Sequence, residues 1–287
     1  IQLFKSYALL AVLLSVSLME ACHTGSNNEN NKTDAEKALE LRKQIDTIEA
    51  PVLSPEESMK HLRIEKGFGI QLVASEPLVH TPVAMRFDSR GRRWVVEMEG
   101  YMPDTVGTGE NRPVGKIVIL EDTTHDGVMD TRKVFMDSLV MPRALCLFDD
   151  GILVAEPPNL WFVENDHDKA GRKYLVDDHY AVGGNVEHQP NGLLRGLDNW
   201  IYSAKSAMRY RRAGKDKWIK EENHFRGQWG ISQDDYGRLY YNNNSANLLG
   251  DYFSPGLGAL NPHQQDDVSG YNENIVPDNR TYPARPT

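Results

Sequence analysis

Cysteine, basic charge and long apolar runs are all scarce in this sequence, and each shortage excludes a class of protein. Two cysteines occur in 287 residues, and neither belongs to a C-x-x-C-H haem-attachment motif. Lys and Arg number 32 against 41 Asp and Glu, and the resulting net charge of −9 argues against a nucleic-acid binder, which needs a basic surface. The apolar run at residues 7–19 is too short for a stable membrane-spanning helix.

The N-terminal segment is instead typical of an export signal. Lys5 precedes the apolar run, and Leu18 stands four residues before Cys22, which follows Ala21. This arrangement resembles the lipobox of bacterial lipoproteins, in which the cysteine is lipidated and becomes the mature N-terminus. The alternative is an ordinary secretory signal with a chance cysteine. Both interpretations place the mature protein outside the cytoplasm; the first predicts a signal peptide at residues 1–21 and a periplasmic or cell-surface protein held to the membrane by a lipid on Cys22.

Residues 22–53 are expected to separate the anchor from a folded domain. An Asn-rich polar stretch covers residues 26–34, and a 3.6-residue apolar period over residues 33–48 predicts a spacer helix. A second, short helix is expected to begin after Ser54, because Pro55 suits the first helical position and Glu57 stands three residues after the cap.

From residue 68 onward, short apolar or alternating runs are separated by Gly, Asp, Asn and Pro, which predicts an all-β domain. An internal repeat favours a β-propeller. It consists of a strand, an Asp-containing turn and an aromatic or aliphatic strand, and it occurs at residues 87–97, 147–156, 195–204 and 232–242. The corresponding positions Trp94, Leu153, Ile201 and Leu239 are about 59, 48 and 38 residues apart, near the period of propeller blades. About four blades are therefore expected, with Trp94, Trp200 and Trp229 in the core between them.

Two segments carry candidate functional residues. His188 precedes a predicted hairpin, just after Gly183 and Gly184, and a loop histidine entering a rigid strand is well placed for catalysis. A hydrogen-bonded turn residue is the alternative. The other segment, residues 121–130, spaces Asp122, Asp126 and Asp130 around Gly127 as calcium loops do, although an Asp-Gly hairpin turn explains the same residues without metal. Cys146 lies in an apolar run and is expected to be a small buried hydrophobe.

Long motifs across the predicted propeller resemble a known family. The runs are PVAMRFDSRGRRWVVEMEGYMP, GILVAEPPNLWF, GNVEHQPNGLLRGLDNWIYSA and FRGQWGISQDDYGRLYYNNNS. They look like the bacterial "membrane-bound dehydrogenase" propeller proteins, which are exported and often fused downstream to c-type haem domains. The resemblance covers residues 54–287, implies that this domain is the N-terminal part of a longer protein, and makes a c-type cytochrome domain the expected electron-transfer partner.

That family is in turn distantly similar to the glucose/sorbosone dehydrogenases, six-bladed propellers that use pyrroloquinoline quinone. The resemblance implies that the four blades belong to a six-bladed propeller and that His188 is the general base. It also implies that Arg226 and Gln228 contact the quinone. Chemically, a histidine is the side chain best suited to accept a hydroxyl proton near neutral pH, and an arginine suits the carboxylates of this cofactor.

Two functions from different classes are therefore expected. The first is an exported dehydrogenase that oxidises a sugar or other alcohol with a quinone and passes electrons to a c-type haem domain. The second is a surface-anchored propeller that binds glycans or protein partners without chemistry, with Arg226 bracing neighbouring blades.

Overall fold

The computed structural model describes residue 36 and residues 52–257, 261, 263 and 269–279. The predicted signal peptide, Cys22 and, apart from residue 36, the predicted spacer helix lie outside the described residues and stay predictions. Within the described part, no helix combines the length and apolarity needed to cross a membrane.

The short helix α3 (Pro55–Lys60) begins where the sequence predicts. The Ser54 hydroxyl accepts a hydrogen bond from the Glu57 amide at 3.2 Å, and Pro55 occupies the first turn, where its missing N–H costs nothing. The expected cap is therefore confirmed.

Four antiparallel sheets of four strands each make up the rest of the described chain, and we call them blades 1 to 4. Within each blade the strands pair in chain order, so every blade is a simple meander. Blade 1 contains β1 (Pro82–Phe87), β2 (Arg93–Glu97), β3 (Gly115–Glu121) and β4 (Thr131–Leu139). Blade 2 contains β5 (Ala144–Phe148), β6 (Gly151–Glu156), β7 (Asn159–Asn165) and β8 (Ala170–Asp177). Blade 3 contains β9 (Asn191–Arg195), β10 (Ile201–Ala204), β11 (Ser206–Arg212) and β12 (Trp218–Arg226). Blade 4 contains β13 (Ser232–Gln233), β14 (Leu239–Asn243), β15 (Ala246–Gly250) and β16 (Glu273–Asn274).

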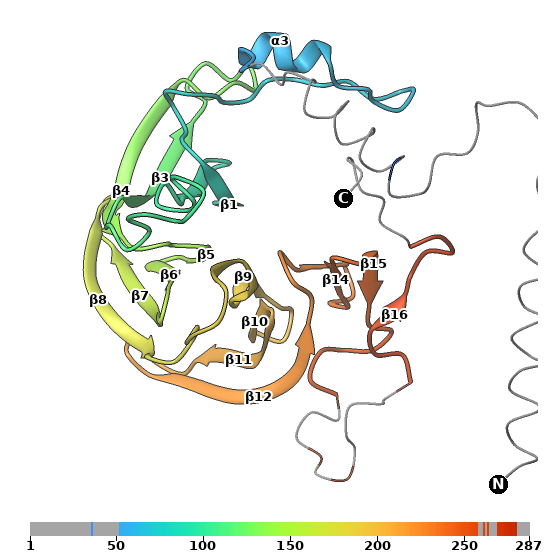
Figure 1. Cartoon of the computed structure of the whole chain (residues 1–287). Helices are drawn as coiled ribbons and strands as arrows, with labels where there is room; N and C mark the ends of the chain where they lie inside the picture. Colours follow the sequence, from blue (N-terminus) through green and yellow to red (C-terminus); the bar gives the residue numbers. More distant parts are fainter. Residues whose placement is uncertain (1–35, 37–51, 258–260, 262, 264–268, 280–287) are drawn as a thin grey trace, which may run out of the picture. The chain divides into compact units, whose positions relative to one another are not determined.

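The blades are arranged as in a β-propeller. Figure 1 shows β4, β8 and β12 along the outer rim, while β1, β5 and β9 lie toward the centre. The innermost strands of consecutive blades contact one another, β1 with β5 and β5 with β9. The predicted all-β propeller fold is confirmed with four blades; a total of six stays a prediction.

Apolar side chains fill the space between neighbouring blades. One cluster joins blades 1 and 2, a second joins blades 2 and 3, and a third joins blades 3 and 4. Because β6 is covered on both faces, five of its six residues are buried rather than alternating. Trp94 and Trp200 lie in these clusters as predicted. Cys146 is also buried, and burial raises its pKa to about 11, so it is an inert core residue as expected.

The predicted repeat corresponds to the first hairpin of each blade, and two copies agree atom by atom. In blade 1, Asp88 Oδ1 accepts from the amides of residues 90 and 92 at 2.9 and 3.0 Å, and Oδ2 accepts from Arg92 Nε at 2.8 Å. In blade 4, Asp234 accepts from the amides of residues 236 and 238 at 3.0 and 2.9 Å and from Arg238 Nε at 2.7 Å. A glycine with φ of 77° follows three residues after the aspartate in both, because the turn requires a left-handed residue there.

Blades 1 and 2 are also joined by a charge cluster that makes stability pH-dependent. Asp168 accepts hydrogen bonds from Arg92 Nη1 and Nη2 at 2.7 and 2.9 Å, and this guanidinium lowers the pKa of Asp168 to about 2. A lowered carboxyl pKa stabilises the fold at pH values above the pKa of the unfolded chain, near 4, and the contribution is lost as the pH falls toward 2.

We therefore expect Asp168→Asn to lower the free energy of unfolding by about 2 kcal/mol at pH 7, with the difference from wild type vanishing between about pH 4 and 2. Urea unfolding at a series of pH values measures this. The matched control is Asp216→Asn, at an exposed position, which should change little. A difference that does not depend on pH would contradict the assigned ion pair.

Candidate functional site

A hollow of about 460 Å³ lies among the loops that link the blades, at the end of the sheets away from the Asp turns. It is lined by Val83, Met98, Tyr101, Val186, Glu187, His188, Gln228, Trp229 and Asn244. His188 comes from the link between blades 2 and 3, and Gln228 from the link between blades 3 and 4. Two of the three residues predicted by resemblance for the dehydrogenase site are therefore brought together; we call this the His188 hollow.

The segment that carries His188 is a short 3-10 helix, η1 (Val186–His188), held in place from several sides. Asn185 caps it by accepting a hydrogen bond from the Glu187 amide at 3.1 Å. The buried Arg143 donates from Nη1 to the Val186 carbonyl at 2.7 Å, and Trp229 Nε1 donates to the Glu187 carbonyl at 2.9 Å. These contacts come from the three links between consecutive blades, so the position of η1 depends on all three links.

A tyrosine and a glutamate form a polar pair in the wall of the hollow. The Tyr101 hydroxyl, from the long β2–β3 loop, donates a hydrogen bond to Glu187 Oε1. This hydrogen bond to the carboxylate, together with partial desolvation, raises the pKa of Tyr101 to about 12. Tyr101 therefore keeps its hydroxyl proton at neutral pH and remains the donor in its hydrogen bond to Glu187.

Asn191, the first residue of β9, connects the link that carries His188 to the link that carries Gln228. Its side chain is buried; Nδ2 donates to the Gln189 and Gln228 carbonyls at 3.1 and 2.7 Å, and Oδ1 accepts from the Gly230 amide at 3.0 Å. The neighbouring Gly192 has φ of 62°, and a Cβ there would lie 3.0 Å from Gly230 Cα. The links can approach this closely because both positions lack a side chain.

Replacing Asn191 with alanine should therefore lower the free energy of unfolding by about 1–3 kcal/mol, since the carbonyl of residue 228 and the amide of residue 230 lose their hydrogen-bond partner. It should also increase amide hydrogen exchange in residues 227–231. Asn242→Ala, at an exposed position on β14, is the control and should change neither quantity. Unchanged exchange in residues 227–231 would show that Asn191 does not hold this link.

His188 itself is exposed, and its imidazole makes no hydrogen bond to another described residue. Its backbone amide donates to the Asn185 carbonyl at 2.8 Å, which fixes the backbone of the segment. An imidazole free on the wall of a hollow can accept a proton from a bound hydroxyl group. The carboxylate of Glu187 and the amides of Gln228 and Asn244 add the hydrogen-bonding groups that recognise hydroxyl-rich ligands.

Arg226 does not line this hollow. Its side chain is 2% exposed, and Nε donates to Asp251 Oδ2 at 2.7 Å, so the last strand of blade 3 is bound to blade 4 through a buried ion pair. Arg226 thus has a charge partner within the fold, as in the alternative interpretation that it braces neighbouring blades. Its predicted contact with a quinone stays a prediction.

In the calcium-like loop, the carboxylates accept hydrogen bonds from the backbone amides of the same loop. Asp122 Oδ2 accepts from the Gly127 amide at 2.8 Å, Asp126 Oδ1 from the Val128 amide at 2.8 Å, and Asp130 Oδ2 from the amide of residue 123 at 2.9 Å. These are the contacts of a hairpin turn. Calcium binding by these three aspartates stays a prediction.

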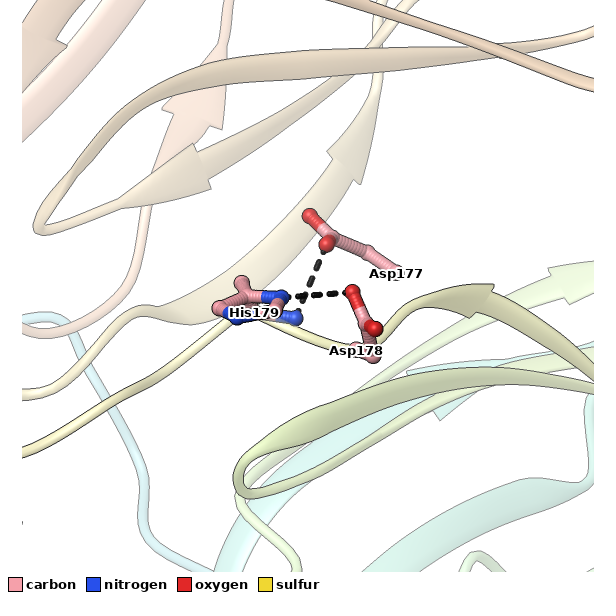
Figure 2. Close-up of side chains that lie close together, drawn as sticks. All are labelled: Asp177, Asp178 and His179. Atoms are coloured by element: carbon pink, nitrogen blue, oxygen red, sulfur yellow. Dashed lines mark hydrogen bonds and ion pairs between the residues drawn. The ribbon is translucent and has the colours of Figure 1, made fainter.

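Among the described residues, the carboxylate and imidazole groups close enough together to hold a metal are those of Asp177, Asp178 and His179 (Figure 2). Asp177, however, already accepts from Tyr210 and Lys220 of blade 3 at 2.7 and 2.6 Å. Burial disfavours its charged form, but these hydrogen bonds outweigh burial and its pKa lies below the usual value. The Asp177 carboxylate therefore links blades 2 and 3 through its bonds to Tyr210 and Lys220.

One family model matches most of the chain. It is described as "Domain of unknown function (DUF7133)" and covers residues 54–285. The chain belongs to this family. No curated protein sequence matches the chain.

Three solved structures show distant similarity in fold to this DUF7133 protein. A structural-genomics target named as a gluconolactonase has a TM-score of 0.39 and 16% identity, covering 58% of this chain and 57% of its own. Streptogramin B lyase has a TM-score of 0.38 and 13% identity, covering 62% and 53%. The extracellular domain of a hybrid two-component system from B. thetaiotaomicron has a TM-score of 0.25 and 10% identity, covering 62% and 32%. The chain thus spans little more than half of the first two proteins, and similarities this low carry no argument about function.

The sequence did not single out Tyr101 or Asn244, and it assigned Trp229 to the core between blades. Trp229 is half-buried and lines the His188 hollow instead. The available signal was its position: it immediately follows Gln228, which the resemblance had already marked.

Proposed function

We propose that this chain is the substrate-binding part of an exported propeller oxidoreductase that acts on a sugar or another alcohol, with His188 accepting the proton of the substrate hydroxyl. The observation that supports the proposal is that His188 and Gln228, from two separate inter-blade links, line one hollow together with Glu187. Its volume of about 460 Å³ lies in the range of small-molecule sites.

The roles of the residues follow from their chemistry. A bound sugar would present one hydroxyl to the His188 imidazole and others to the Glu187 carboxylate and the Gln228 amide. Removal of the hydroxyl proton raises the electron density on the carbon that is oxidised, so the base facilitates loss of hydride from that carbon. The ring of Trp229 supplies an apolar surface for the C–H groups of the sugar.

The cofactor in this proposal is pyrroloquinoline quinone, which would accept the hydride, with a c-type haem domain as the next electron acceptor. The described residues fit this group incompletely. A tricarboxylate requires cationic partners, yet the lining of the His188 hollow includes neither Lys nor Arg, and Arg226 is neutralised by Asp251. Quinone binding, calcium binding and electron transfer to haem stay predictions.

One observation favours a second candidate, a non-catalytic propeller that binds glycans or protein partners. Catalytic histidines are commonly oriented by a hydrogen bond to the second ring nitrogen, and the His188 imidazole makes none to a described residue. The same polar hollow would then serve for recognition alone.

The deciding experiment uses the full polypeptide purified without its signal segment. Pyrroloquinoline quinone and calcium are added, cofactor binding is measured by calorimetry, and dye reduction is followed across a panel of sugars and alcohols. Cofactor binding with turnover would support the oxidoreductase. Sugar binding without turnover would support the recognition protein, and the absence of any binding would rule out both.

Export and lipid anchoring are proposed on the sequence pattern alone. Cells fed a radiolabelled fatty acid should label the wild-type protein and not Cys22→Ser. Equal labelling of the two would eliminate Cys22 as the lipid attachment site.

A further inference from the structure

A second hollow, of about 410 Å³, lies at the opposite end of the sheets from the His188 hollow. It is formed by the β1–β2 and β5–β6 turns together with Arg195, the last residue of β9. Three blades therefore contribute to it, and its volume lies in the range of small-molecule sites. We call it the Asp-turn hollow.

One of its arginines is already neutralised within the fold. Arg92 Nε donates to Asp88 at 2.8 Å, and Nη1 and Nη2 donate to Asp168 at 2.7 and 2.9 Å. Each of the three nitrogens of this guanidinium donates to a carboxylate, so the charge of Arg92 is neutralised within the wall of the hollow.

Two other arginines keep donors free. Arg90 is 63% exposed, and its only ion pair within the described chain is a long contact of 3.4 Å to Asp168. Arg195 is exposed; its Nη2 donates to Asn199 Oδ1 at 2.7 Å, and it has no carboxylate partner among the described residues. The lining also contains the exposed Asp149. Its carboxylate has neither a hydrogen bond nor an ion pair with a described side chain.

The charged residues of the lining, three arginines against Asp88 and Asp149, therefore leave the hollow with one net positive charge, on a chain whose net charge is −9. Because the overall charge repels anions, an anionic ligand needs such a local excess of cations. The Asp149 carboxylate can accept a hydrogen bond from a hydroxyl group of a ligand. Leu147 and Phe148, both half-buried, add an apolar strip to the lining, and the Arg195 guanidinium lies 5.5 Å from the centre of the Phe148 ring.

From this arrangement we propose that the Asp-turn hollow binds a sugar acid, a hydroxylated molecule with a single carboxylate. The carboxylate pairs with the guanidinium groups of Arg195 and Arg90, a hydroxyl donates to Asp149, and the C–H face of the sugar packs on the apolar strip. This site is distinct from the His188 hollow and independent of any chemistry there.

The test is calorimetric titration of the full polypeptide with glucuronate and, as its neutral counterpart, glucose. Glucuronate should bind at least about tenfold more tightly than glucose, with an advantage that weakens as salt is raised. Arg195→Gln and Arg90→Gln should each reduce glucuronate affinity, the first by about tenfold or more. Equal affinity for the two sugars, or no binding of glucuronate, overturns the proposal.

Two control variants locate the binding. Arg172→Gln removes an exposed arginine on β8, outside the lining of the hollow, and should leave the affinity unchanged. Trp229→Ala alters the His188 hollow and should also leave it unchanged. If Trp229→Ala abolishes glucuronate binding while Arg195→Gln does not, the ligand binds at the His188 hollow and the proposal is wrong. Since the side chains of Arg195 and Arg90 are exposed, both variants should fold, and thermal melting verifies this.

Discussion

Replacing His188 with glutamine should lower kcat/KM for alcohol oxidation by about 100- to 10,000-fold, the range expected when a general base is removed. Glutamine retains hydrogen-bonding capacity and similar size but cannot accept the hydroxyl proton. Since the other groups that hold the sugar remain, the loss should fall mainly on kcat, with KM changing much less. Steady-state dye reduction with the best substrate of the panel measures both.

The matched control is His179→Gln, which makes the same substitution at another exposed loop histidine. His179 is not among the residues lining the hollow, so this variant should keep wild-type kinetics. A His188→Gln enzyme with full activity would show that another group is the base.

Asp251→Ala should lower the free energy of unfolding by about 3–5 kcal/mol, the largest effect on stability that we expect. Asp251 is buried and holds the 2% exposed Arg226, and it also accepts from the Tyr241 hydroxyl at 2.8 Å. Its removal leaves a buried guanidinium without a counter-charge. Because whole domains are stable by only about 5–15 kcal/mol, the variant should be close to unfolding at 37 °C.

Two comparisons make this prediction specific. Asp150→Ala breaks the exposed pair with Arg212, in which Asp150 is 53% exposed, and should cost less than about 1 kcal/mol. The double variant Arg226→Leu with Asp251→Leu removes both charges and should recover much of the loss, since an apolar pair can replace a buried ion pair. Urea unfolding measures all three. Equal losses for Asp150→Ala and Asp251→Ala would show that the Arg226–Asp251 pair does not stabilise the junction of blades 3 and 4.

The same ion pair explains why Arg226 lies outside the lining of the His188 hollow. In the sequence, an arginine two residues before Gln228 looks available to an anionic cofactor. Its availability, however, depends on Asp251, which follows it by 25 residues and lies in another blade. No local pattern reveals that partner, because pairing across blades is decided by how the sheets stack.

Trp229 illustrates the reverse case. A tryptophan at a repeat position is usually core, and Trp94 and Trp200 are. The link that carries Trp229 instead turns its indole toward Glu187, which places it on the wall of the hollow. The sequence likewise gave no indication of Tyr101, because its place in the wall depends on a hydrogen bond to Glu187, which is 86 positions away.

The sequence by itself determined the propeller blades, the Asp turns between their first strands and the capped helix after Ser54. All of these follow from local chemistry: strand alternation, left-handed glycines and side chains that cap nearby amides act within a few residues. Tertiary structure alone decided that His188 and Gln228 line one hollow, that Asp251 neutralises Arg226, and that Arg90 and Arg195 share a hollow at the opposite end. Those outcomes depend on how blades stack around a centre, and stacking brings together residues that no short segment contains.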